Sequence, residues 1–105
     1  SRAKDLCMTG EFVSGTQAAA DGLIDDSHSA EDLDHKVTEF AEDIASKPPL
    51  AVRAIKDAIN HSRNVGLEDG TEYEYKTYLP LLHTEDYQEG SEAFGSDRDP
   101  SWEGR

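Results

Sequence analysis

Three segments of the chain carry apolar residues at every third or fourth position, and this spacing restricts the fold more than any other feature. In the first segment these residues are Leu33, Val37, Phe40, Ala41 and Ile44. In the second they are Val52, Ile55, Ala58 and Ile59, and in the third Tyr75, Tyr78, Leu79 and Leu82. Such spacing places each set on one face of an α-helix. Because alternating strand patterns are nearly absent, we predict an all-α chain.

Prolines set the expected ends of these helices. Ser29 is a good capping residue, so the first helix is expected over residues 29–46. Pro48 and Pro49 stop it and open the next, because proline is tolerated in a first helical turn but not in the interior. Pro80 falls inside the third pattern, at about residues 68–83, and predicts a kink or an early end there.

Shorter helices flank these three. Residues 3–8 are expected to form the last turns of a helix that Gly10 closes, and a brief helix further on ends at Gly22, since glycine favours the left-handed conformation found after helices. At the other end, Asp86 is expected to cap a helix that runs to Phe94. The chain after it is expected to be irregular.

The charge balance excludes some classes of partner. The 105 residues include 23 acidic and 10 basic ones, for a formal net charge of −13. Such a chain repels phosphate backbones and anionic lipid, so we expect no nucleic-acid or membrane partner. The acids are interleaved with apolar residues rather than gathered in a block, which favours a folded domain over an acidic tail. Surfaces of this kind are typical of halophilic proteins, in which molar salt screens the repulsion.

Other features indicate a cytoplasmic protein. No apolar run approaches 20 residues, and no signal-peptide pattern is present. The single cysteine, Cys7, cannot form an internal disulfide. No residue pattern around it is typical of an activated thiol, so we expect a small core residue rather than a nucleophile.

No residue pattern by itself predicts an active site. The carboxylates of Glu85, Asp86 and Glu89 lack the apolar surroundings that an acid–base pair needs, so we expect Asp86 to cap a helix and the two glutamates to be solvated. His28 and His35 lie among acidic residues but without metal-ligand spacing. We therefore predict neither catalytic residues nor a metal site within this chain.

Four motifs in fixed order resemble those of one family. They are Thr9-Gly10, the segment Ser14–Ile24, the segment Pro48–Lys56 with its pattern PPLAVRAIK, and the segment Asp86–Trp102 with EG, AF, R and P-x-W elements. In this order they resemble the C-terminal part of the crotonase superfamily, the enoyl-CoA hydratase/isomerase family. The resemblance covers essentially the whole chain.

This resemblance implies a fragment of a larger enzyme. Residues 1–28 would be the end of a core-domain helix, a short link and a short helix. Residues 29–105 would form the C-terminal helical trimerisation and lid region, with an irregular tail from about residue 95. The spiral β/α core and the catalytic residues would lie upstream, outside this chain.

The resemblance also implies a function and candidate ligand contacts. The full-length protein would be a lyase or isomerase acting on acyl-CoA thioesters, with hydration of 2-enoyl-CoA favoured, assembled as a trimer or hexamer. It would need no separate cofactor, because coenzyme A is part of the substrate. By position, Phe94 and Arg98 match the family's CoA-binding aromatic and cation. The family often has a lysine where Asp97 stands here, and Arg98 or Lys56 could compensate for its loss.

Alternatives remain open at this point. Phe94 could simply pack in a core, and Arg98 could pair with Asp97, Asp99 or Glu92. At the level of function, the alternative is a stand-alone acidic helical module that binds other proteins without catalysis.

Overall fold

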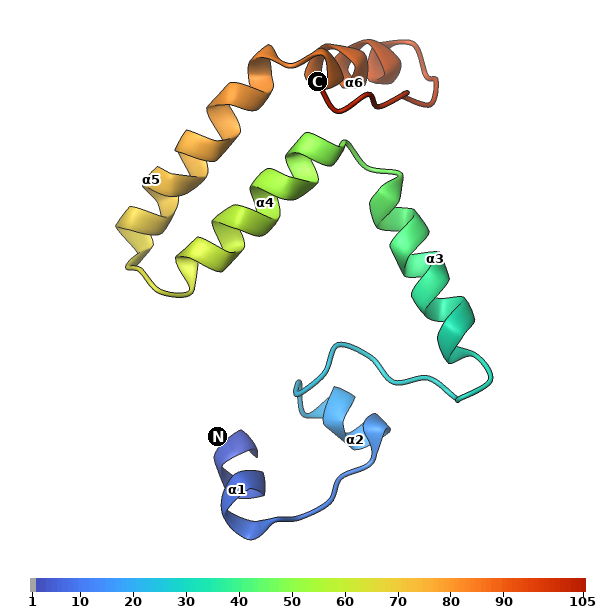
Figure 1. Ribbon diagram of the computed structural model, residues 1–105, viewed down its shortest axis with the longest axis vertical. Coiled ribbons are helices and arrows are strands. Elements are labelled where there is room, and N and C mark those ends of the chain that lie inside the picture. Colours follow the sequence, from blue (N-terminus) through green and yellow to red (C-terminus); the bar gives the residue numbers. More distant parts are fainter. Residues whose placement is uncertain (1) are drawn as a thin grey trace. The chain divides into compact units, whose positions relative to one another are not determined.

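The computed structural model describes residues 2–105, which form helices joined by irregular links, the longest of them over residues 21–32 (Figure 1). The helices are α1 (Arg2–Thr9), α2 (Gly15–Ala20), α3 (Leu33–Ala45), α4 (Pro49–Ser62), α5 (Leu67–Tyr78), the 3-10 helix η1 (Leu79–His83) and α6 (Glu85–Gly95). No strand occurs among residues 2–105, so the predicted all-α class is confirmed. The chain divides into two compact units, one ending at Phe40 and the other running from Ala41 to Arg105.

Glycines follow the helices of the first unit as predicted. The backbone φ of Gly10 is +68° after α1, and that of Gly22 is +70° after α2. Both values lie in the left-handed region that costs glycine little. The Ser14 hydroxyl accepts a hydrogen bond from the Gln17 amide at 3.1 Å and caps α2.

Two details of the first unit differ from expectation. Cys7 is exposed, because α1 leaves it uncovered by any other described element, so the predicted core position is wrong. The helix expected from residue 29 begins at Leu33. Ser29 and Asp32 do form reciprocal side-chain contacts, with the Ser29 hydroxyl accepting from the Asp32 amide at 3.1 Å and donating to its carboxylate at 2.6 Å. These contacts stabilise a turn at residues 29–32, directly before α3.

In the second unit, α4 and α5 form a helical hairpin and lie side by side (Figure 1). One polar contact across the hairpin joins the Tyr73 hydroxyl to the Asp57 carboxylate at 2.9 Å. The His61 ring stacks on the ring of Tyr73, with centroids 3.8 Å apart. Helix α5 ends at Tyr78, two residues before Pro80, and the chain continues as the 3-10 helix η1. The predicted early end at this proline is confirmed.

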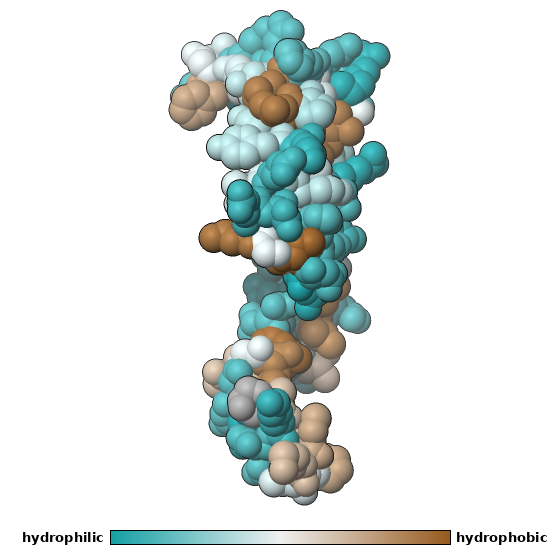
Figure 2. Space-filling model, turned by 90° about the vertical axis from the view of Figure 1, so that its left-hand side faces the viewer, coloured by the Kyte–Doolittle hydropathy of each residue, from teal (hydrophilic) through white to brown (hydrophobic). Residues whose placement is uncertain are grey.

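Few side chains are buried among residues 2–105. Only Ala93 and Asp86 have exposed fractions below a tenth. The helical apolar faces are present but uncovered: Phe40 on α3 is 68% exposed and Ile59 on α4 is 59% exposed. Figure 2 shows hydrophobic side chains at the surface between polar ones. These faces therefore need a partner surface that the described residues do not supply.

Among residues 2–105, every helix falls short of the length and apolarity that a membrane crossing requires.

Candidate functional site

The residues after α6 fold back along that helix and are held by the carboxylate of Asp86. Its Oδ1 accepts the backbone N–H of Glu103 at 2.7 Å, and its Oδ2 accepts that of Gly104 at 3.0 Å. The amide of Asp86 in turn donates to the carbonyl of Arg105 at 3.0 Å. Asp86 is only 4% exposed. A buried carboxylate needs such donors, because an unpartnered one would be costly.

Asp86 therefore does not have the role that the sequence predicted. The N-cap of α6 is Thr84, whose hydroxyl accepts from the Tyr87 amide at 3.2 Å. Asp86 lies in the first turn, with its carboxylate occupied by the returning tail. An acidic residue is favoured both at the N-cap and in the first turn of a helix, so the local sequence does not distinguish these two positions. Only the contacts with the tail show that Asp86 holds the tail and does not cap the helix.

One turn further along α6, Glu89 makes the second attachment. Its two oxygens accept from the terminal nitrogens of Arg98 at 2.6 Å and 2.8 Å, a two-pronged ion pair. Its Oε1 also accepts the Ser101 amide at 2.7 Å. The Arg98 hydrogen bonds, followed by that of Ser101, lower the pKa of Glu89 to about 2. We call the Asp86 and Glu89 attachments together the tail clamp.

Trp102 forms a third attachment. Its indole Nε1 donates to the backbone carbonyl of Ser46, just after α3, at 2.8 Å. Its ring lies on α6 at Gly90, where a Cβ atom would stand 3.1 Å from Cη2 of the indole. The absence of a side chain at Gly90 thus makes room for the indole. The tail is irregular in backbone conformation, as predicted, but it is fixed along α6.

An apolar groove of about 490 Å³ lies beside the tail, bordered by α4, the end of α5, η1 and α6. Among the side chains that line it are Leu50, Ile55, Tyr87, Phe94 and Trp102. Phe94 stands at its edge and is 91% exposed. Phe94 is therefore not packed in a core formed by residues 2–105. Its ring is available for a ligand or for a partner surface.

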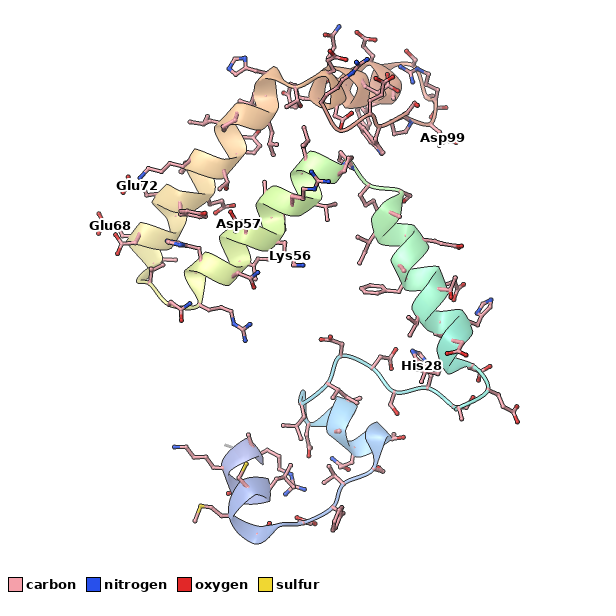
Figure 3. All side chains as sticks on the ribbon, viewed as in Figure 1. His28, Lys56, Asp57, Glu68, Glu72 and Asp99 are labelled. Carbon is pink, nitrogen blue, oxygen red and sulfur yellow. The ribbon has the colours of Figure 1, made fainter. Side chains whose placement is uncertain are left out.

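The three predicted CoA-binding residues occupy different surroundings. Phe94 lines the apolar groove, whereas Arg98 is engaged in the tail clamp. Lys56 lies at a shallow, open depression on α4 that Arg53, Asp57 and Asn60 also line. Figure 3 shows Lys56 directed away from α5.

The partner of Arg98 also differs from the acids named by sequence proximity. Arg98 pairs with Glu89 rather than with Asp97, Asp99 or Glu92, and it additionally donates to the Asp99 carbonyl at 3.3 Å. The reason lies in the chain turn after α6, where Asp97 has a positive φ of +51°. This turn directs the following residues back along the helix, towards Glu89. Nearness in sequence could not identify that partner.

The acidic and histidine residues do not gather into a metal site. Among residues 2–105, no three or more His, Cys, Asp or Glu side chains are placed to hold one ion. His28 lies 3.2 Å from the Asp26 carboxylate, and His35 lies 3.7 Å from that of Glu39. Each is a single contact between neighbours in sequence.

Comparisons with solved structures identify the architecture. An enoyl-CoA hydratase from Bacillus anthracis superimposes with a TM-score of 0.96 at 38% identity, over 100% of this chain and 41% of the solved one. An enoyl-CoA hydratase from Geobacillus kaustophilus HTA426 gives a TM-score of 0.93 at 31% identity, over 99% and 39%. The helices thus have the arrangement of one part of a crotonase-type enzyme.

The sequence comparisons give the family. The model of the enoyl-CoA hydratase/isomerase family matches residues 1–105, and this chain belongs to that family. A relative in Salmonella typhimurium, carnitinyl-CoA dehydratase, is 32% identical over 105 residues. That match covers 96% of this chain and 40% of the relative. The chain therefore spans well under half the length of the relatives it matches.

Proposed function

We propose that this chain is the C-terminal helical part of an enzyme that acts on acyl-CoA thioesters, with hydration of a 2-enoyl-CoA as its reaction. The observation that carries the proposal is the family match across residues 1–105, together with the names of the similar proteins. A stand-alone interaction module would not be expected to share both sequence and helix arrangement with these enzymes over residues 1–105.

The proposed reaction adds water across the double bond conjugated to the thioester. The hydroxyl joins the carbon distal to the carbonyl, and a proton joins the carbon next to it. Negative charge develops on the thioester oxygen during the reaction, and two backbone N–H groups would stabilise it. Carboxylates outside this chain would move the protons. We assign no catalytic residue to residues 1–105.

This chain would then supply cover, assembly and ligand contacts. The exposed apolar faces on α3 and α4 suit packing against the rest of the enzyme and against other copies in a trimer or hexamer. Phe94, Arg98 and Lys56 are the proposed contacts to the CoA nucleotide, and the 91% exposed ring of Phe94 supports its part. The acidic composition supports a halophilic organism, and the single cysteine supports a cytoplasmic location.

The direct test is an assay of the full-length protein. Hydration removes the conjugated double bond, so the ultraviolet absorbance of a 2-enoyl-CoA should fall when the enzyme is added. The matched comparison is carnitinyl-CoA, whose dehydration would instead create such a bond. If neither thioester is turned over in molar KCl or in dilute buffer, the proposed reaction is wrong. Light scattering on the same protein tests the trimer or hexamer, which a monomer would contradict.

A further inference from the structure

The link between α3 and α4 has no internal support. It consists of residues 46–48. The amides of Ser46 and Lys47 donate back to carbonyls of α3, and Pro48 has no N–H to donate. Within the described part of the chain, residues 2–105, no hydrogen bond joins α3 directly to α4. The link alone therefore leaves the angle between these two helices free to change.

Helix packing does not fix α3 either. The helices that pack closely against each other are α4 with α5, and η1 with both α5 and α6. None of the α3 side chains is buried among residues 2–105. The direction in which α3 leaves α4 therefore needs support from another segment of the chain.

The tail crosses the link and contacts the helix end on each side of it. On the α3 side, Trp102 donates its indole N–H to the Ser46 carbonyl at 2.8 Å. On the α4 side, a Cβ atom on Gly104 would stand 3.4 Å from Cγ of Pro49, so the Gly104 backbone lies directly on the first residue of α4. We call residues 101–105 the strap. The strap bridges two helices that no direct hydrogen bond joins within residues 2–105.

The strap in turn is held by α6. Glu89 accepts the amide just before Trp102 at 2.7 Å, and the buried carboxylate of Asp86 accepts the two amides just after it at 2.7 Å and 3.0 Å. The backbone of Trp102 is thus fixed on both sides. Neither carboxylate bonds to α3. An effect of Asp86 or Glu89 on α3 must therefore pass through the strap.

The indole nitrogen distinguishes support of the link from simple cover of the apolar groove, which Trp102 also lines. A phenylalanine ring at position 102 could cover the groove but would have no donor for Ser46. The Ser46 carbonyl follows the last turn of α3, where carbonyl groups lack a partner inside the helix. A donor supplied from the strap therefore satisfies a group that α3 itself leaves unpaired.

We propose that the strap is a latch that fixes the angle between α3 and α4, and that Asp86 and Glu89 are positioning residues for α3 through it. When the Trp102 bond breaks, α3 can pivot about residues 46–48. Its apolar face, which includes Val37 and Phe40, then changes direction. Exposed apolar faces dock onto other surfaces, so the latch decides in which direction α3 is presented for docking. The inference is independent of the proposed reaction.

Hydrogen exchange of the full-length protein, followed by mass spectrometry of its peptides, tests the proposal. Trp102→Phe keeps an aromatic ring on α6 but removes the donor, so exchange over residues 41–47 should become about fivefold faster, the factor expected for one lost hydrogen bond. Glu89→Gln should accelerate exchange there too, although Glu89 does not bond to α3. Exchange in α5 should stay unchanged in both variants. The double variant should exceed the larger single effect only slightly, because both changes open the same latch.

Glu92→Gln is the matched control. It removes the same charge from α6, but the Glu92 carboxylate accepts the side chain of Gln88 at 2.8 Å and holds no part of the strap. Exchange over residues 41–47 should therefore not change in this variant.

Three outcomes would overturn the proposal. Unchanged exchange over residues 41–47 in Trp102→Phe and Glu89→Gln would show that another contact fixes α3. Equal acceleration over residues 41–47 and in α5 would show general destabilisation of the fold instead of a latch. Equal effects of Glu92→Gln and Glu89→Gln would reduce the result to a change of charge on α6.

Discussion

The carboxylate of Glu89 faces the guanidinium of Arg98 across nine positions of sequence, and the two groups meet through two hydrogen bonds of 2.6 Å and 2.8 Å. This pair joins the middle of α6 to the chain that returns after it. Glu89 also holds the Ser101 amide. The orientation of the tail therefore depends on a small number of polar contacts to one face of one helix.

The first prediction is that Arg98→Ala and Glu89→Gln act on one shared network. Each change removes the two-pronged pair, so each should lower the melting temperature, and the double variant should lower it by little more than the larger single effect. Thermal unfolding followed by circular dichroism measures this. Lys36→Ala is a control, because it breaks an exposed pair of neighbours on α3 and should change the melting temperature less. Fully additive effects of Arg98→Ala and Glu89→Gln would show that the two residues act independently.

The second prediction concerns acid. The pKa of Glu89 is lowered from an ordinary 4.5 to about 2, with Arg98 as the main cause. A carboxyl group whose folded-state pKa is depressed stabilises the fold fully above its unfolded value and loses that contribution as the pH falls. Stability should therefore decrease between about pH 4.5 and pH 2 through this group, in the window bounded by the two pKa values. In Glu89→Gln the decrease over this window should be smaller. An identical acid profile for both proteins would contradict the assignment.

The third prediction separates a ligand role of Arg98 from a structural one. If the tail contacts the CoA nucleotide, Arg98→Ala in the full-length enzyme should raise KM about tenfold or more and leave kcat little changed, because such a contact is equal in ground and transition states. Asp97→Asn should lower KM by removing a negative charge beside the cation. Asparagine is the suitable replacement, because Asp97 has a φ of +51° and asparagine tolerates that conformation. Unchanged KM values with a lower melting temperature would make Arg98 purely structural.

The fourth prediction concerns Trp102. Trp102→Phe removes the 2.8 Å hydrogen bond to the Ser46 carbonyl and should lower the free energy of unfolding by about 1 kcal/mol. Tyr75→Phe is the matched control, because Tyr75 is 61% exposed and its hydroxyl makes no hydrogen bond within residues 2–105. Gly90→Ala should fail to give the usual helix-stabilising gain of about 1 kcal/mol, since its Cβ would lie 3.1 Å from the indole. A full gain at Gly90 would contradict close packing of Trp102 on α6.

The local features could be predicted from the sequence, whereas the tail clamp could not. Gly10, Gly22 and Pro80 act on the backbone within a few residues, so each helix end that they govern is where the sequence indicated. Asp86 and Glu89 were assigned as a cap and a solvated acid, because both roles follow from position in a helix. Their actual partners lie nine to eighteen residues away and depend on the return of the chain after α6. No periodic pattern encodes such a return.

The surroundings of the candidate ligand residues could not be predicted from the sequence either. Phe94 and Arg98 were identified by family resemblance, and the sequence could not indicate that one would be open and the other paired.

The fifth prediction concerns salt. With 23 acidic and 10 basic residues, repulsion should exceed the stabilisation from exposed ion pairs in dilute buffer. Because the screening length falls to about 3 Å at 1 M salt, the melting temperature should rise from dilute buffer to molar KCl. Replacing Glu42 and Glu74, which form no ion pair among residues 2–105, by glutamine should raise the melting temperature in dilute buffer and reduce the effect of salt. A melting temperature independent of KCl would exclude halophilic adaptation but not the family.

The hydrogen bond from Trp102 to Ser46 also has a consequence for the order of folding. It joins positions 56 residues apart, whereas the α4–α5 hairpin forms between neighbours in the chain. Closing a long loop costs more entropy than closing a short one, so the hairpin should form early and the indole should dock late. During synthesis, the end of α3 cannot gain this contact until Trp102 has left the ribosome. Indole fluorescence should therefore report the last step of refolding, after helical circular dichroism has recovered.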